Sequence, residues 1–130
     1  MSTMLDQQRK TLITGAVFMF LCVAFGAFGA HALKEMLTEV GARQYDLGIR
    51  YAFIHALAIL IAALARPLAV NAGQLSLAVW FFIAGIVLFA GSLMLLGVTQ
   101  NTLFALFTPL GGLSFLMGWG MFIFSMRAVK

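Results

Sequence analysis

Residues 26–33 read Gly-Ala-Phe-Gly-Ala-His-Ala-Leu and close a long apolar run that begins near Thr11. The run is about 23 residues long, which is enough for one α-helix to cross a bilayer. The stretch places two glycines, three alanines and one histidine together near the end of that helix. Small residues of this kind are typical of the face on which membrane helices pack. The stretch therefore predicts a first membrane span whose far end meets other helices.

The whole chain has the composition of a membrane protein. Of its 130 residues, 63% are hydrophobic and 9% are charged, whereas a soluble domain carries about 25% charged residues. So few charges cannot cover a water-facing surface, and most of the exterior must therefore face lipid. The net charge of +4 comes from basic residues outside the apolar runs. This is the usual pattern beside membrane helices, so we expect no nucleic-acid partner.

Three further apolar runs follow the first. We expect spans at about residues 11–33, 47–65, 75–98 and 103–126, all within one transmembrane domain that covers residues 1–130. Short connections between the second and later runs favour antiparallel neighbours. The predicted fold class is therefore an all-α membrane protein, with four transmembrane helices in an up-down bundle.

Residues 34–50 hold half of the charged residues of the chain. An approximate helical apolar stripe runs along this segment and consists of Leu33, Leu37, Val40 and Leu47. This pattern predicts a short amphipathic helix on the membrane surface between spans one and two, with a break near Gly41.

The basic residues predict the orientation of the chain. With four spans, both termini and the second loop lie on one side, which carries five Lys and Arg residues against three on the other. The positive-inside rule places the more basic side, and hence both termini, in the cytoplasm.

Glycines recur on the expected packing faces. Gly15, Gly26 and Gly29 fall on one face of span one. Such a stripe lets a neighbouring backbone approach closely, which is how helices associate in lipid. We expect Gly85 in span three and Gly118 in span four to serve the same purpose. Gly26 and Gly29 are predicted to pack directly against another helix.

Span four contains Thr108 followed by Pro109. A proline inside a helix removes one hydrogen bond and clashes with the preceding turn. The alternative that fits better is that Thr108 caps a helix whose first residue is Pro109. Residues 103–107 would then form a separate interfacial or shallow re-entrant segment.

Four stretches of the chain resemble the signatures of a known family. They are residues 26–33 (GAFGAHAL), 51–58 (YAFIHALA), 88–93 (LFAGSL) and 108–119 (TPLGGLSFLMGW). With these stretches the chain resembles the domain-of-unknown-function 423 family, whose bacterial members are small YgdD-like inner-membrane proteins. The resemblance implies a four-helix protein of the bacterial inner membrane. It implies no activity, because the family is uncharacterised.

The polar residues of the spans are expected to share one depth, at the end opposite the termini. This candidate cluster comprises His31, His55, Ser92, Thr108, Pro109, Gly111 and Gly112. One interpretation is that these groups hydrogen-bond across helices and hold the bundle together. The other is an outer-leaflet pocket for a ligand, an ion or a lipid headgroup, in which N–H groups at residues 109–112 favour an anion. In either case His31 and His55 are predicted to point inward and to approach each other or share a partner.

No catalytic set can be assembled from these residues. No acidic residue lies inside an expected span, and two histidines are an incomplete metal site. We therefore expect no catalytic residue, no metal and no cofactor. The favoured function is a non-enzymatic structural or interaction protein, with the lipid bilayer, other membrane proteins or self-association as its partners. The alternative is a small-molecule, proton or lipid-handling protein that uses the outer polar cluster around His31 and His55.

Overall fold

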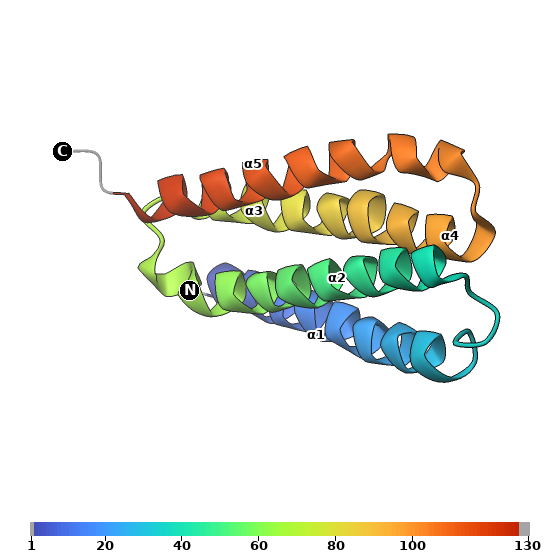
Figure 1. Cartoon of the computed structure of the whole chain (residues 1–130). Coiled ribbons are helices and arrows are strands. Elements are labelled where there is room, and N and C mark those ends of the chain that lie inside the picture. The colour runs from blue at the N-terminus through green and yellow to red at the C-terminus, as the bar shows by residue number, and fades with distance from the viewer. Residues whose placement is uncertain (1, 128–130) are drawn as a thin grey trace.

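The computed structural model describes residues 2–127, and this part of the chain folds into long helices that run up and down (Figure 1). Four of its helical segments are long and apolar enough to cross a membrane, so the predicted all-α fold with four spans is confirmed. The elements in chain order are α1 (Ser2–His31), α2 (Glu39–Ala65), η1 (Arg66–Leu68), α3 (Ala72–Gly85), η2 (Ile86–Ala90), α4 (Gly91–Thr99), η3 (Thr102–Leu106) and α5 (Thr108–Met126).

The helices lie in a row, with α1 at one end and α5 at the other (Figure 1). The α1 helix packs mainly against α2, and α5 packs mainly against α3 and η2. Between these pairs, α2 also packs against α4. Because α1 has one main neighbour, much of its apolar surface is left to face lipid.

Glycines allow the two end pairs to approach closely. A Cβ atom added to Gly15 would lie 2.7 Å from the side chain of Leu60 in α2, and one added to Gly29 would lie even closer to the ring of Tyr45. On the other side of the molecule, Gly85 faces the ring of Phe115 and Gly118 faces that of Phe82. Side chains at these four positions would push the helices apart.

Gly26 also faces α2, but less tightly. An added Cβ there would lie 3.5 Å from Ile49, which is an ordinary van der Waals contact. The predicted glycine stripe on span one therefore contains positions where an added Cβ would clash with α2, such as Gly15 and Gly29, and one where it would fit, Gly26.

The contact between α2 and α4 depends on glycines that the sequence analysis did not select. Gly41 and Gly97 face one another so closely that a Cβ on either would meet the carbonyl oxygen of the other. About two turns further along α2, a Cβ on Gly48 would lie 2.9 Å from the carbonyl oxygen of Ala90. Gly41 and Gly48 are seven residues apart, and this spacing of small residues is the sequence signal that could have indicated the face of α2 that packs on the third span.

The predicted surface helix between spans one and two does not form as a separate element, and that prediction is wrong. Instead, α2 begins at Glu39 and continues without a break to Ala65. The Thr38 hydroxyl caps it by accepting a 3.0 Å hydrogen bond from the N–H of Gly41. Gly41 does not break the helix. It lies where α2 packs against α4, at a point where a side chain would clash.

The third span contains a π-helix. α3 leads into η2, where the N–H of Gly91 donates to the carbonyl of Ile86, five residues earlier. Single π-turns of this kind insert an extra residue into an otherwise regular helix, and they are frequent at functional sites. In this chain the π-helix lies where α2 and α5 both pack against the third span.

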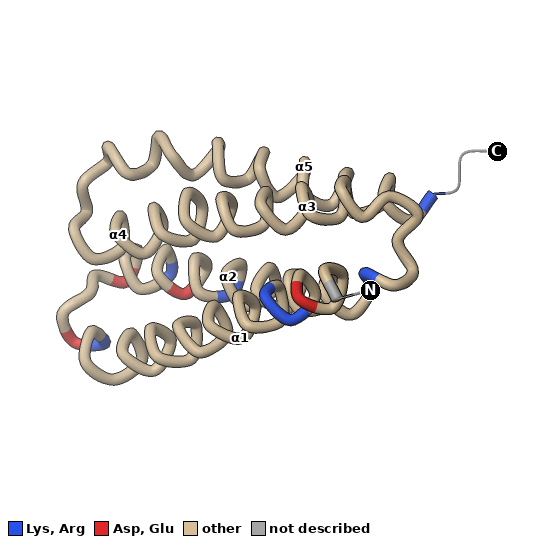
Figure 2. The backbone as a smooth tube through the Cα atoms, turned by 180° about the vertical axis from the view of Figure 1, so that it is seen from behind, with Lys and Arg blue, Asp and Glu red and all other residues tan. Residues whose placement is uncertain are grey.

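Charged residues gather toward the two ends of the helices, and on α2 they extend as far as Arg50, near its middle (Figure 2). At the end that holds the N-terminus, Arg66 donates hydrogen bonds to Gln7 of α1 at 2.6 Å and to Ser76 of α3 at 3.1 Å. From the other end toward the middle of α2, Glu39 pairs with Arg43 and Asp46 pairs with Arg50, all at exposed positions. Arg66 and Glu39 lie at the two ends of α2, where helices usually leave the hydrocarbon.

Candidate functional site

His55 is buried in the middle of the molecule, with both ring nitrogens engaged. Its Nδ1 lies 2.7 Å from the carbonyl oxygen of Tyr51, and its Nε2 accepts a 3.2 Å hydrogen bond from Nε1 of Trp119. A carbonyl can only accept, so Nδ1 carries the proton and the imidazole is in its neutral form. The side chain is 4% exposed. No nitrogen of this ring is left to bind a ligand or a metal.

Aromatic rings enclose His55. Its ring stacks on Phe115, with centroids 3.4 Å apart and planes 10° apart, and Phe82 lies against it at 5.7 Å. Phe115 and Trp119 belong to α5, while His55 belongs to α2. The histidine therefore joins α2 to α5 by stacking and by one hydrogen bond, which is a structural role.

The structure does not bring His31 and His55 together. His31 is the last residue of α1 and is exposed. Gly29 lies against Tyr45, and His55 follows Tyr45 by ten residues, or about 15 Å along α2. The shared histidine site fails because α2 begins at Glu39, which places His55 about 24 Å from the start of its helix rather than one turn inside it.

Ser92 and Thr108 do meet, away from both histidines. Their hydroxyl oxygens are 2.7 Å apart, and the Ser92 hydroxyl lies 3.0 Å from the carbonyl oxygen of Phe89. Because the carbonyl only accepts, Ser92 donates to Phe89 and Thr108 donates to Ser92. The expected cap on α5 is thus wrong: Thr108 is the first residue of α5, and its hydroxyl bonds to the third span instead.

The N-terminus of α5 does not present the expected N–H groups to an anion. Pro109 has no N–H, and the N–H of Gly111 donates to the carbonyl of Phe107 at 3.0 Å. Gly111 is buried against the backbone of Phe89, where an added Cβ would clash. Gly112 lies beside the Phe89 ring, with 3.8 Å of clearance for a Cβ. These glycines serve helix packing at the π-helix.

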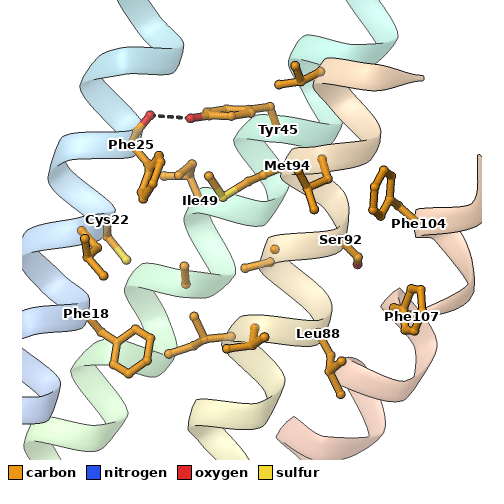
Figure 3. A pocket seen from close by; sticks show the side chains of 18 of the residues that line it. Phe18, Cys22, Phe25, Tyr45, Ile49, Leu88, Ser92, Met94, Phe104 and Phe107 are labelled. Carbon is orange, nitrogen blue, oxygen red and sulfur yellow. Dashed lines mark hydrogen bonds between the residues drawn. The ribbon is translucent and has the colours of Figure 1, made fainter. Parts of the chain in front are cut away.

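The molecule also contains an apolar groove that the sequence analysis missed (Figure 3). We call it the apolar groove. One wall is the aromatic face of α1, and the other is formed by Phe104 and Phe107 around η3. Its floor contains Ile49 and Ala52 of α2, with residues 86–98 of the third span beside them. Its volume is about 650 Å³, within the range of about 300–1,000 Å³ for ligand pockets.

One sequence signal could have indicated this groove. Phe18, Phe25 and Phe28 recur on one side of α1, next to its glycine face. Phe25 and Phe28 are about half exposed, which leaves them without a helix partner. An aromatic stripe beside a packing stripe predicts a second contact surface on the same helix. Only the tertiary structure shows that the opposite wall of the groove comes from residues 104–107.

Within the described part of the chain, nearly all buried polar side-chain atoms have hydrogen-bond partners. Among residues 2–127, no three His, Cys, Asp or Glu side chains lie close enough together to hold a metal ion. Within the same residues, the Nε atom of Arg66 is the one buried side-chain nitrogen or oxygen that lacks a hydrogen bond. The polar groups of the interior are thus engaged with one another, and the open surface is hydrocarbon.

Comparison with known proteins gives a consistent result. The family described as "Protein of unknown function (DUF423)" matches residues 25–112. The chain is 38% identical to the UPF0382 membrane protein YwdK of Bacillus subtilis, over 92% of this chain and 95% of that one. It is 40% identical to the UPF0382 inner membrane protein YgdD of Escherichia coli K12, over 88% and 87% of the two chains.

A UPF0382 membrane protein of Haemophilus influenzae is 37% identical, over 86% of this chain and 89% of that one. No solved structure matches this chain. The match to the family spans more than half of the chain, and these relatives align over most of its length. The resemblance seen in the sequence is confirmed: this chain belongs to the DUF423 family, whose function is unknown, and like the relatives named above it is a membrane protein.

Proposed function

We propose that this protein is a non-enzymatic interaction protein that binds another hydrophobic component of the membrane in the apolar groove. The observation that carries the proposal is the groove itself, an open concavity of about 650 Å³ with an almost wholly hydrocarbon lining. Reacting groups would need polar side chains that converge on a shared point. The buried polar groups near the groove are instead bonded to each other, as Ser92 is to Thr108 and Phe89.

The alternative function, in which a polar cluster around His31 and His55 handles a proton or a small polar ligand, has less support. His31 is exposed at the end of α1, and both nitrogens of His55 are engaged. The groove therefore replaces the histidine cluster as the candidate working surface. The proposal keeps the lipid bilayer as the environment and adds a bound component within it.

A matched pair of photo-crosslinking positions tests the proposal. Val87 lines the groove and Leu113 lies outside its lining, and both side chains are 59% exposed. Gly85 faces Phe115 and Phe89 faces Gly111, so residues 87 and 113 lie at about the same depth. We expect p-benzoylphenylalanine at position 87, at native expression level, to give one discrete adduct, and the same group at position 113 to give only diffuse labelling.

Equal, diffuse labelling at both positions would overturn the proposal, because the groove would then hold nothing more specific than the rest of the lipid-facing surface. A discrete adduct at position 113 alone would move the interaction surface to α5 and would contradict it equally. The chemical nature of a discrete adduct at position 87, whether protein or lipid, does not affect this test.

A further inference from the structure

We infer that the apolar groove is a site for one acyl chain of a phospholipid, drawn from the leaflet on the side opposite the chain termini. This inference rests on the proposed function and names its ligand. It is carried by two features of the groove, namely its length and its lining. The length favours a single hydrocarbon chain over a protein helix, and the lining favours hydrocarbon over a polar ligand.

The length of the groove matches one leaflet. Its lining on the third span covers residues 86–98, about 18 Å of helix, and on α1 it covers residues 18–28, about 15 Å. The hydrocarbon core of a bilayer is about 30 Å thick, so one leaflet contributes about 15 Å. A transmembrane helix of a partner protein would need a groove that extends through both leaflets, over about 30 Å. The inner end of the lining, at Ile86, lies midway along the third span (Ala72–Thr99), so the groove occupies about one half of that span, as one acyl chain would.

The lining has no group that would recognise a polar ligand. Among the side chains that line it, the Ser92 hydroxyl is bonded to Phe89 and Thr108, the Tyr45 hydroxyl is bonded to the carbonyl of Phe25, and Cys22 is buried. The remaining contact surface is aliphatic and aromatic. In a bilayer, water provides no driving force between apolar surfaces, so binding depends on van der Waals contact and on filling space. A single acyl chain held between Phe25 and Phe104 can fill the apolar groove more completely than the disordered chains of bulk lipid.

One hydrogen bond joins the α1 wall of the groove to its α2 floor (Figure 3). The Tyr45 hydroxyl donates a 2.7 Å hydrogen bond to the carbonyl of Phe25, which fixes the α1 wall against α2. The lining continues beyond this bond to Phe28, Leu33 and Val98, at the end of the groove near the α1–α2 connection. The charged residues of that connection lie toward this end (Figure 2). The headgroup of a lipid whose chain fills the groove would therefore lie at this end, beside the connection.

Two glycines provide a matched test of occupancy. Gly91 lines the groove, and the nearest atom to an added Cβ is the carbonyl oxygen of Ile86 at 3.9 Å. Gly120 of α5 is outside the lining and has no atom within 4 Å of an added Cβ. Gly91→Leu would fill the groove, whereas Gly120→Leu would add the same side chain elsewhere. Both changes replace a helical glycine by a good helix former, so both variants should remain folded.

The probe is a phosphatidylcholine with a diazirine near the end of one acyl chain, added to nanodiscs of phosphatidylethanolamine and phosphatidylglycerol that hold the full-length protein. We expect photolabel to concentrate in the peptides that cover residues 18–28 and 86–98. Labelling there should fall about tenfold in Gly91→Leu and remain at the original level in Gly120→Leu. Native mass spectrometry should show one retained phospholipid in the unaltered protein and in Gly120→Leu, and none in Gly91→Leu.

Should Gly91→Leu fail to fold, Val87→Trp with Leu113→Trp as its control repeats the test at two exposed positions of equal depth. Even labelling of all lipid-facing helices, or labelling that Gly91→Leu leaves unchanged, would overturn the acyl-chain site. A protein adduct from the photo-crosslinker at position 87, with no retained lipid, would overturn this inference and leave the proposed function standing. Loss of every discrete adduct would overturn both.

Discussion

At the scale of single residues, the two histidines of this chain have opposite environments. His55 is enclosed by rings and uses both nitrogens, whereas His31 is exposed at the end of α1. Ionisable residues in membrane spans are functional candidates by default, because burying an unpaired one is costly. Here the cost is met by partners from Tyr51 and Trp119, so the residue serves to hold α2 against α5.

The first prediction concerns these two side chains. His55→Ala should lower the melting temperature in detergent, because it leaves the Trp119 N–H without a partner and opens a cavity beside Phe115. The expected loss is about 1–3 kcal/mol of unfolding free energy. His31→Ala serves as the control and should leave the melting temperature unchanged. A larger loss in His31→Ala than in His55→Ala would contradict the structural role assigned to His55.

At the scale of elements, the π-helix η2 decides how α5 packs. The carbonyl of Phe89 in η2 accepts from Ser92, which in turn accepts from Thr108 at the start of α5. The backbone of the same residue lies directly against Gly111. One irregular turn thus contacts α5 by hydrogen bonding at one point and by close packing at the next. Both contacts lie beside the wall that Phe107 adds to the groove.

A second prediction tests this contact with two adjacent glycines. Gly111→Ala should destabilise the protein by about 1–3 kcal/mol, because the new methyl group would collide with the backbone of Phe89, which cannot move aside cheaply. Gly112→Ala should be neutral or slightly stabilising, since its Cβ would have 3.8 Å of clearance and alanine favours helix. Thermal melting followed by circular dichroism measures both. Equal melting temperatures for the two variants would contradict the close approach of α5 to η2.

At the scale of the whole molecule, the arrangement of the helices in a row produces the groove. A closed bundle would bury the aromatic face of α1 against a fourth helix. In this chain α1 has α2 as its main neighbour, and α5 lies at the far end of the row (Figure 1). The exposed aromatic residues of α1 then face the η3 segment across the floor of α2 and the third span. The concavity belongs to the assembly of all four spans and to no single helix.

The third prediction concerns orientation. The side that holds both termini and the α2–α3 connection carries five Lys and Arg residues against three on the other side, so we expect the termini in the cytoplasm. A reporter active only in the cytoplasm should be active when fused after Lys130 and inactive when fused after Asn101. The reverse pattern would invert the orientation and would place the groove in the cytoplasmic leaflet.

The sequence by itself determined the class of protein, the family and the number of spans. Apolar runs of sufficient length are local features, because each span must satisfy the bilayer on its own. The tight packing of Gly15, Gly29, Gly85 and Gly118 also agrees with the faces that the sequence indicates, since small residues have few other uses at those positions.

Only the tertiary structure decided where α2 begins, how the polar residues pair and where the groove lies. α2 begins at Glu39, two residues before Gly41, which packs against Gly97 far away in the chain. This early start places His55 near the middle of α2 and separates it from His31 at the end of α1. The groove depends on which faces of α1 and η3 remain unpaired after all the helices have packed. Such pairings depend on the fit between distant side chains, and local hydrophobicity and periodicity do not contain that information.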